Sequence, residues 1–315
     1  MIKRVLVYNS GGGIGDSIQL FPLFLSLENL FKESEIHYLG AHENHYLGKL
    51  KEYNIKVKTL KLGLKYFGFR WWHLFVAKKN FSKLKLGEFD LIIDCQSKFR
   101  NTIILKQIPS KAFYSSTFNN MFCSRLEMSA EKFWSNLKTT DYDIKNIPKK
   151  YFDESARLLP DKNYIGFSLT QGNVYRKKEW PLDKVIKLSD VLIKNNKIPV
   201  FLIEKKYHEL KSQIKNSIPT ALFPEHETSL DSPALVTCLG TRMDLAITID
   251  NGIMHMLSLS KVPMISLFGP TDSMKFAPQY ENSKVLDSKK IYNSKNVSDI
   301  SVEDVIRAAK QFVNF

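Results

Sequence analysis

Short, continuous runs of apolar residues alternate with amphipathic segments along the chain, and this alternation limits the fold more than any other feature. The run at 89–95, FDLIIDC, is apolar over most of its length, as a strand buried on both faces of a parallel sheet must be. Alternation of such strands with helical segments predicts an α/β fold with doubly wound parallel sheets. The predicted strands are 3–8, 35–40, 55–60, 89–95, 111–116, 164–170, 198–203, 243–250 and 262–269.

The length of the chain predicts two domains. Its 315 residues exceed the size at which a single core usually stops growing. The segment 141–160 contains two prolines and no long apolar run, so we place the boundary within it. We predict an N-terminal domain at 1–155, a C-terminal domain at 156–300, and a final helix at 301–315 that begins with a capping box of Ser301 and Asp304.

Composition bounds the class of protein and its partners. Hydrophobic residues make up 43% and charged residues 25%, which is typical of a globular protein. The 46 Lys and Arg against 32 Asp and Glu give a net charge of +14, which favours anionic partners. Cys95, Cys123 and Cys238 form no CxxC pair, so we expect reduced core thiols. Without a long apolar run or signal peptide, a cytoplasmic location is expected.

The first predicted strand ends in a glycine-rich turn, NSGGGIGDSIQLFP, at 9–22. This turn does not fit the dinucleotide fingerprint, because Asp16 stands where the third glycine of GxGxxG would be. The turn brings Asp16 to the start of a helix, where the helix dipole stabilises a carboxylate. Two interpretations of Asp16 stay open at this point: a helix N-cap or a functional carboxylate.

Two regions of the second half have the composition of a phosphate site. The segment 176–181, RKKEWP, follows a strand and the small residues Ser168, Thr170 and Gly172, although a solvated basic turn has the same composition. Polar, glycine-containing loops also follow the strands 243–250 and 262–269. Helix N-termini at such loops present free N–H groups to phosphate and ribose. A single histidine on an apolar helix, as here in 251–260, is usually a core residue.

Five stretches together resemble the bacterial lipopolysaccharide heptosyltransferases, glycosyltransferase family 9. They occur in family order and span nearly the whole chain: GGIGDSIQLFP at 12–22, FDLIIDCQSKFRNTIIL at 89–105, RKKEWP at 176–181, DLAITIDNGIMHMLSLSKVPMISLFGPTD at 244–272 and SVEDVIRAA at 301–309. The resemblance implies the GT-B fold, in which two Rossmann-like domains face each other across a cleft. It also implies that the C-terminal helix crosses back to pack on the N-terminal domain.

The resemblance assigns roles to single residues. Asp16 matches the proposed general base that deprotonates the acceptor hydroxyl, and Lys178 matches a lysine that contacts the diphosphate. Asn251 stands where the family usually has threonine. Whether Glu204, Glu209 or neither contacts the ribose stays open. The implied donor-binding residues are Thr170, Gly172, Lys178, Asp250, Asn251, Gly252, His255 and Thr271, and the weaker acceptor-binding set is Gly13, Lys98 and Arg100.

The implied activity is inverting transfer of a sugar, a heptose from ADP-heptose, to a lipopolysaccharide core-type acceptor. Neither a cofactor nor a metal is expected, and the DYD sequence at 141–143 is interpreted as solvated linker. A GT-B-fold nucleotide-sugar epimerase and a nucleotide-sugar-binding protein without transfer activity are the alternatives.

The segment 61–85 mixes six Lys and one Arg with a dense group of aromatic residues. Three interpretations stay open: contact with an anionic membrane, binding of single-stranded nucleic acid, and a packed helix with snorkelling lysines. Together with the resemblance, the segment favours a lipid-linked phosphorylated acceptor and peripheral contact with an anionic inner membrane. A nucleic-acid partner is not expected.

Overall fold

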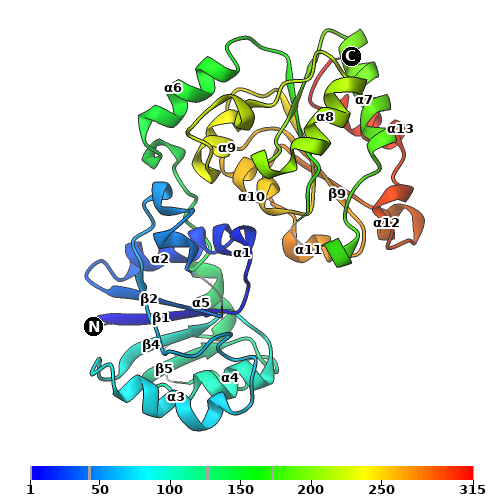
Figure 1. Ribbon diagram of the computed structural model, residues 1–315. Coiled ribbons are helices and arrows are strands. Elements are labelled where there is room, and N and C mark those ends of the chain that lie inside the picture. The colour runs from blue at the N-terminus through cyan, green and yellow to red at the C-terminus, as the bar shows by residue number, and fades with distance from the viewer. Residues whose placement is uncertain (1, 42–43, 125–127, 172–173, 315) are drawn as a thin grey trace. The chain divides into compact units, whose positions relative to one another are not determined.

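The computed structural model describes residues 2–314 except 42–43, 125–127 and 172–173. The chain forms two compact units, Met1–Tyr142 and Asp143–Phe315. Each unit contains one five-stranded sheet with helices against it (Figure 1). Every strand pair in both sheets is parallel, so the predicted fold class is confirmed.

The first sheet has the strand order β3-β2-β1-β4-β5. Helices α2 and α3 lie on opposite faces of this sheet (Figure 1). The strands are β1 (Arg4–Asn9), β2 (Glu35–Gly40), β3 (Lys58–Thr59), β4 (Phe89–Asp94) and β5 (Ser110–Ser115). The helices are α1 (Ile14–Ile18), α2 (Phe21–Leu30), α3 (His73–Ser82), α4 (Phe99–Leu105) and α5 (Ala130–Asn136).

The second sheet has the strand order β10-β9-β8-β6-β7. Its strands are β6 (Tyr164–Ser168), β7 (Ile198–Phe201), β8 (Leu245–Ile249), β9 (Met264–Phe268) and β10 (Ser283–Asp287). Its helices are α6 (Lys149–Leu158), α7 (Leu182–Lys194), α8 (His208–Ser217), α9 (Pro233–Gly240), α10 (Gly252–Leu259), α11 (Ser273–Phe276), α12 (Ser288–Tyr292) and α13 (Val302–Ala309).

Burial on both faces explains why the predicted strands form. All five residues of β6, β8 and β9 are buried, as central strands of a sheet covered on both faces must be. Each strand predicted from an apolar run is present, although β3 is only two residues long. Strand β10 was not predicted, because this edge strand is buried only at Leu286 and Asp287 and therefore needs no apolar run.

The boundary between the units lies after Tyr142, not after residue 155 as predicted. The boundary lies earlier in the chain than predicted because α6 packs against α9 and so belongs to the second unit. Tyr151 and Ser155 are buried in that contact face while the other face is polar. Such an amphipathic helix contains no continuous apolar run, which is why its sequence resembled a linker.

The C-terminal helix α13 belongs to the second unit. It packs against α7, β9 and β10, and Val305 is fully buried in the core of that unit. This placement differs from the expectation that 301–315 packs on the N-terminal domain. The capping box is confirmed, since Asp304 N donates to Ser301 Oγ and Ser301 N donates to Asp304 Oδ2, both at 3.0 Å.

Three further expectations concern membranes, metals and thiols. Within the described ranges, no helix combines the length and the apolarity needed to cross a bilayer. The same ranges contain no group of three or more His, Cys, Asp or Glu side chains arranged to hold a metal ion. All three cysteines are free thiols; Cys238 is buried, whereas Cys95 and Cys123 are partly exposed.

The packing of α13 predicts the effect of removing two methyl groups from its buried face. We expect Val305→Ala to lower the free energy of unfolding of the second unit by about 2 kcal/mol, from lost burial and the cavity left behind. Urea unfolding followed by the fluorescence of Trp180, which is buried in the same core, measures this. Glu303→Ala changes an exposed position of the same helix and serves as the control. Equal midpoints for the two variants would contradict the docking of α13.

Candidate functional site

Each sheet has a point where the chain reverses the direction in which strands are added. In the second sheet β6 lies between β7 and β8, and in the first sheet β1 lies between β2 and β4. Open parallel sheets bind ligands at the carboxyl ends of the strands at such a point, because the connecting segments leave there in opposite directions. The polar loops predicted from the sequence follow these same strands.

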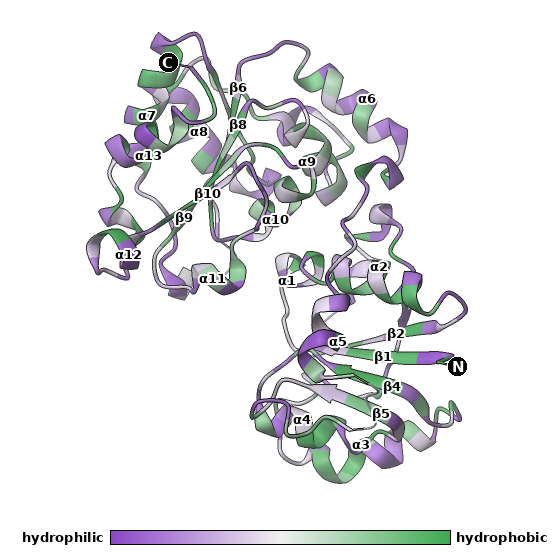
Figure 2. Ribbon diagram, turned by 180° about the vertical axis from the view of Figure 1, so that it is seen from behind, coloured by the Kyte–Doolittle hydropathy of each residue, from purple (hydrophilic) through white to green (hydrophobic). Residues whose placement is uncertain are grey.

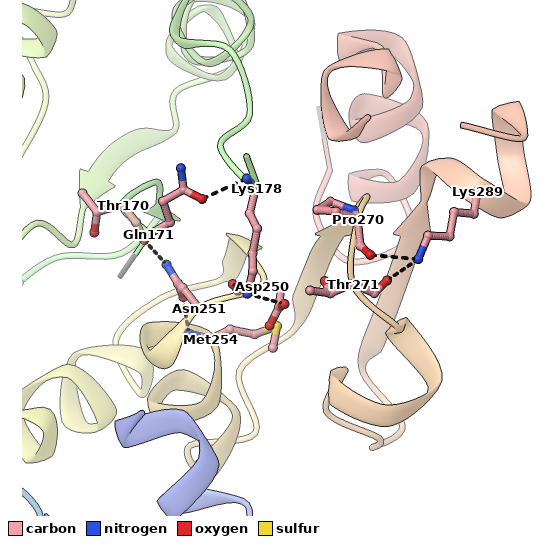
Figure 3. A network of polar contacts seen from close by, with 9 residues as sticks. All are labelled: Thr170, Gln171, Lys178, Asp250, Asn251, Met254, Pro270, Thr271 and Lys289. Carbon is pink, nitrogen blue, oxygen red and sulfur yellow. Dashed lines mark hydrogen bonds and ion pairs between the residues drawn. The ribbon is translucent and has the colours of Figure 1, made fainter. Parts of the chain in front are cut away.

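In the second unit, the side chain of Asn251 joins the ends of β6 and β8 (Figure 3). Its Oδ1 accepts a hydrogen bond of 3.0 Å from Met254 N and so caps α10. Its Nδ2 donates to the Thr170 carbonyl at 2.8 Å and to Ser168 Oγ. A threonine cap has no amide group to make both donations. Asn251 therefore fixes the start of α10 relative to β6, and its amide is engaged within the protein.

Lys178 and Asp250 form an ion pair beside this cap. Lys178 Nζ lies 2.6 Å from Asp250 Oδ2 and 3.0 Å from the Asp250 carbonyl oxygen (Figure 3). The two side chains are only 14% and 9% exposed, so the pair is largely shielded from water. An ammonium group has three N–H donors, which leaves one of them for a ligand. The backbone N–H of Lys178 is held by Gln171 Oε1 at 2.9 Å.

The N-terminus of α10 adds backbone donors to the same place. Gly252 is its first residue, and the first N–H groups of a helix lack intrahelical acceptors. These N–H groups and the helix dipole attract anions. His255 lies in the next turn and is buried, with 6% exposed. Lys178, Asp250, Asn251 and Gly252, all predicted from the sequence, are thus brought together.

The loop after β9 is in contact with a second cation that the sequence did not predict, Lys289 of α12. Lys289 Nζ donates to the carbonyl oxygens of Pro270 at 3.2 Å and Thr271 at 2.8 Å (Figure 3). Thr271 Oγ1 is buried and has no hydrogen-bond partner among the described residues, so it is available to a ligand. Lys289 follows β10 in the chain, and because that strand gave no apolar signal, its loop was not recognised.

The structure does not assign two of the predicted donor contacts, Gly172 and the ribose contact. Gly172 lies outside the described residues. Neither Glu204 nor Glu209, the candidate ribose contacts, is buried, and Glu204 Oε2 accepts from Lys206 Nζ at 2.9 Å. The structure adds Glu225 as a buried carboxyl that no pattern in the sequence indicated. Its carboxyl is 6% exposed, and Oε2 has no partner in the described part of the chain. Burial raises the pKa of Glu225 to about 7.

In the first unit, the glycine turn folds around Asp16. Asp16 Oδ2 accepts a hydrogen bond of 3.0 Å from Gly13 N, so Gly13 is the N-cap of α1 and Asp16 lies three residues later. The interpretation of Asp16 itself as the N-cap is therefore wrong. A Cβ atom at Gly11 would lie 2.6 Å from Asp16 Cβ, which explains the glycine. Asp16 is half-buried, and its Oδ1 makes no hydrogen bond among the described residues.

A second side-chain bridge joins the strand ends of the first unit. Gln96 Nε2 donates to Asn9 Oδ1 at 2.6 Å, and Gly11 N donates to the same oxygen at 3.0 Å. This bridge links the end of β1 to the loop after β4, in the way that Asn251 links β6 and β8. It therefore ties the glycine turn at Gly11 to the loop that carries Gln96.

Asp94 lies at the end of β4, and the sequence predicted only that it belongs to a strand. Its side chain is 1% exposed, and its Oδ2 accepts from Thr102 Oγ1 at 2.6 Å and Ser115 Oγ at 2.8 Å. Its Oδ1 accepts from Gln96 N at 3.0 Å. Burial raises the pKa of Asp94 to about 6 against the opposing effect of these donors. The carboxyl thus anchors the loop that carries Gln96.

The acceptor candidates Lys98 and Arg100 both lie near the aromatic ring of Phe69. Lys98 Nζ lies 5.8 Å and Arg100 Cζ 6.0 Å from the ring centre of Phe69. Arg100 Nε also donates to the Gly68 carbonyl at 2.9 Å. Arg100 is therefore partly a structural residue, whereas Lys98 is exposed.

A pocket of about 810 Å³ lies in the first unit at the carboxyl ends of β2 and β3. No pattern in the sequence indicated this pocket. Its lining includes the basic side chains Lys61 and Lys65 together with Tyr66, and on the β2 side Asn44 and Leu47. The next residue after Asn44, His45, lies with its Nε2 3.2 Å from the Gly12 carbonyl oxygen. The pocket therefore lies close to the Asp16 turn.

The sequence and the fold are similar to those of known proteins. A family model described as glycosyltransferase family 9 (heptosyltransferase) matches residues 78–306. Lipopolysaccharide heptosyltransferase 1 of Campylobacter coli is 24% identical over 344 residues, a match that covers 95% of this chain and 96% of that protein.

Solved structures agree in fold. A family 9 glycosyl transferase from Veillonella parvula gives a TM-score of 0.68 at 20% identity, over 98% of this chain and 97% of that one. The E. coli ADP-heptose lipopolysaccharide heptosyltransferase II gives a TM-score of 0.64 at 15% identity, over 99% and 98% of the two chains. These likenesses establish the GT-B fold, built from two Rossmann-like units.

The burial of Asp94 predicts how stability depends on pH. The pKa of this group rises from 3.8 in the unfolded chain to about 6 in the folded protein. Between these values the folded state binds a proton that the unfolded state has lost, so this contribution to stability falls as pH rises through that window. The total change is about 3 kcal/mol, at 1.36 kcal/mol per pKa unit.

Asp94→Asn removes this titration. We expect the unfolding free energy of the wild type, relative to the variant, to be higher at pH 4 than at pH 7 by about 2 kcal/mol, which is most of the total change because the unfolded carboxyl is already partly ionised at pH 4. Urea unfolding of both proteins across this range measures the difference. Asp153→Asn, at an exposed position, controls for the loss of one carboxylate. A difference that does not vary with pH would show that Asp94 titrates normally.

Proposed function

Because the chain belongs to glycosyltransferase family 9, the heptosyltransferase family, we propose that it transfers a heptose from ADP-heptose to a lipopolysaccharide core-type acceptor. The protein is a glycosyltransferase, and the proposal adds the donor, the acceptor and the inverting course of the reaction. Support for the sugar comes from the lipopolysaccharide heptosyltransferase of C. coli, and support for the donor from the ADP-heptose enzyme of E. coli.

The observation that carries the proposal is the Lys178–Asp250 pair at the start of α10. The pair is held by two contacts to Asp250 and leaves one N–H of the ammonium for an anionic ligand. A diphosphate that meets this N–H group and the first N–H groups of α10 would receive charge-assisted hydrogen bonds from two directions. Such a site binds the donor through its diphosphate, which every nucleotide diphosphate sugar contains.

The same donors would assist the departure of the nucleotide diphosphate. Negative charge develops on the leaving phosphate oxygen as the bond to the anomeric carbon breaks. Fixed donors directed at developing charge lower the barrier, because they need no reorganisation during the reaction. We assign this role to Lys178 and the N-terminus of α10 in place of a divalent ion, with the hydroxyl of Thr271 as a further contact.

We assign the general base to Asp16. In an inverting displacement the acceptor hydroxyl attacks the anomeric carbon from the side opposite the leaving diphosphate and must lose its proton. Asp16 Oδ2 is engaged with Gly13 N, which orients the carboxylate. Oδ1 has no partner among the described residues and is the oxygen that would take the proton.

We propose that the acceptor is lipid-linked and phosphorylated and binds the first unit. The pocket beside the Asp16 turn has a volume of about 810 Å³ and carries Lys61 and Lys65, which suits an anionic sugar. Lys98 is a further exposed cation of the same unit. A cytoplasmic location and peripheral contact with an anionic inner membrane follow from this choice of acceptor and stay predictions.

The phosphate site is tested by Lys178→Ala. We expect the affinity for ADP to fall by about 1.5–3 kcal/mol, the typical value of a charged hydrogen bond. Isothermal titration calorimetry measures this. Lys177→Ala removes the same charge at the neighbouring exposed position and should bind ADP nearly as the wild type does. Equal affinities for all three proteins would remove Lys178 from the donor site.

The base is tested by Asp16→Asn. The amide oxygen of asparagine still accepts from Gly13 N, so the turn is kept while the proton acceptor is lost. We expect turnover at saturating donor and acceptor to fall by a factor on the order of 10²–10⁴, with ADP affinity and melting temperature unchanged. Near-normal turnover would exclude Asp16 as the base. Conversion of the donor without any acceptor would instead indicate an epimerase.

A further inference from the structure

Three large aromatic side chains lie exposed at the start of α3. Trp71, Trp72 and Phe75 are 53%, 54% and 81% exposed, and we call these three residues the aromatic patch. Residues three and four apart share one face of a helix, so Phe75 lies beside both tryptophans. The opposite face of α3 carries His73, Ala77 and Phe81, which are buried. The helix is therefore packed on one side, and its first turn exposes apolar rings to solvent.

Exposed cations flank the aromatic patch along the chain. Lys65, Arg70, Lys78, Lys79, Lys83 and Lys85 are all exposed. None of the six forms an ion pair with a described residue. The sequence has no Asp or Glu between Glu52 and Glu88, so nothing local neutralises them. Figure 2 shows hydrophilic and hydrophobic residues side by side on α3. The chain thus concentrates part of its net charge of +14 around exposed rings.

We propose that the aromatic patch and the six cations around it dock the first unit onto an anionic lipid bilayer. Aromatic rings partition into the headgroup boundary while Lys and Arg pair with anionic headgroups, which is how interfacial helices bind. A second copy of the chain fits this surface poorly, because two faces that carry only positive charge repel each other. The inference rests on the proposed function, because a lipid-linked acceptor would lie in the bilayer to which the first unit binds.

The position of the surface relative to the pocket supports this assignment. Lys65 and Tyr66 line the pocket at the ends of β2 and β3, and only four residues separate Tyr66 from Trp71 in the chain. Tyr66 is itself 50% exposed. A bilayer in contact with the aromatic patch would therefore lie close to the rim of the pocket. An acceptor would reach the pocket without its lipid chains leaving the membrane.

The experiment measures binding of the full chain to vesicles of phosphatidylcholine with and without phosphatidylglycerol, by co-sedimentation, in the absence of donor and acceptor. We expect binding to the anionic vesicles only, and loss of it at high salt. Arg70→Ser/Lys78→Ser/Lys79→Ser should weaken binding roughly a hundredfold, at about fivefold per charge. Phe75→Ser, at the most exposed ring, should weaken it by about tenfold with an unchanged melting temperature.

A matched control separates this surface from net charge. Lys162→Ser/Lys194→Ser/Lys284→Ser removes three exposed lysines of the second unit and should bind vesicles as the wild type does. If both triple variants lose binding equally, the proposal is wrong. Retained binding by the patch variants, binding of the wild type to single-stranded oligonucleotides in preference to vesicles, or a wild-type dimer that Phe75→Ser dissociates would also overturn it.

Tryptophan emission gives an independent readout. Trp71 and Trp72 are half-exposed, whereas Trp180 is buried and Trp134 is stacked on Tyr114, so a blue shift on addition of anionic vesicles should come from the patch. Trp71→Phe/Trp72→Phe should abolish the shift and keep vesicle binding. Because neither measurement involves sugar transfer, failure of docking and failure of the proposed activity are distinguishable: a protein that binds membranes without transferring heptose contradicts only the latter.

Discussion

The hydrogen bonds of the Asn251 side chain are the interaction on which the second unit's site depends. They hold the end of β6 against the start of α10, and so they fix the helix N-terminus next to the Lys178–Asp250 pair. A helix N-terminus stabilises a bound anion best when the helix is held rigidly. The N–H groups of a mobile terminus would hydrogen-bond to water and would have to reorient before they bind the ligand. The Gln96–Asn9 bond has the same role for the glycine turn of the first unit.

The two units differ in how their cations are arranged. In the second unit, the two cations of the candidate site are paired or hydrogen-bonded to carbonyl groups: Lys178 to Asp250 and Lys289 to Thr271. Pairing lowers the free charge of the site but fixes the direction of the remaining donors, which suits recognition of one diphosphate. In the first unit, the cations of 61–85 are exposed. Unpaired charge gives long-range attraction without fixed geometry, which suits a bilayer or a flexible phosphorylated acceptor.

Particular elements show where sequence reasoning succeeded. Strands β6, β8 and β9 and helix α10 were predictable because burial on both faces demands continuous apolar residues, and the loops after them contained the polar residues of the site. The same reasoning failed for β10 and α6, since an edge strand and an amphipathic helix bury only a few residues each. The failure at β10 also hid Lys289, and the failure at α6 moved the domain boundary.

The sequence by itself determined the α/β class, the two-unit organisation, the family, and which loops carry Asp16, Lys178 and Asp250, because all of these follow from local patterns along the chain. Only the tertiary structure decided which side chains meet. The contact between Lys178 and Asp250, which stand 72 positions apart in the chain, depends on how distant segments pack. So do the burial of Asp94 and the exposure of Trp71, Trp72 and Phe75. A hydrophobic residue in the sequence has the same letter whether it is covered or not, and only packing distinguishes the two.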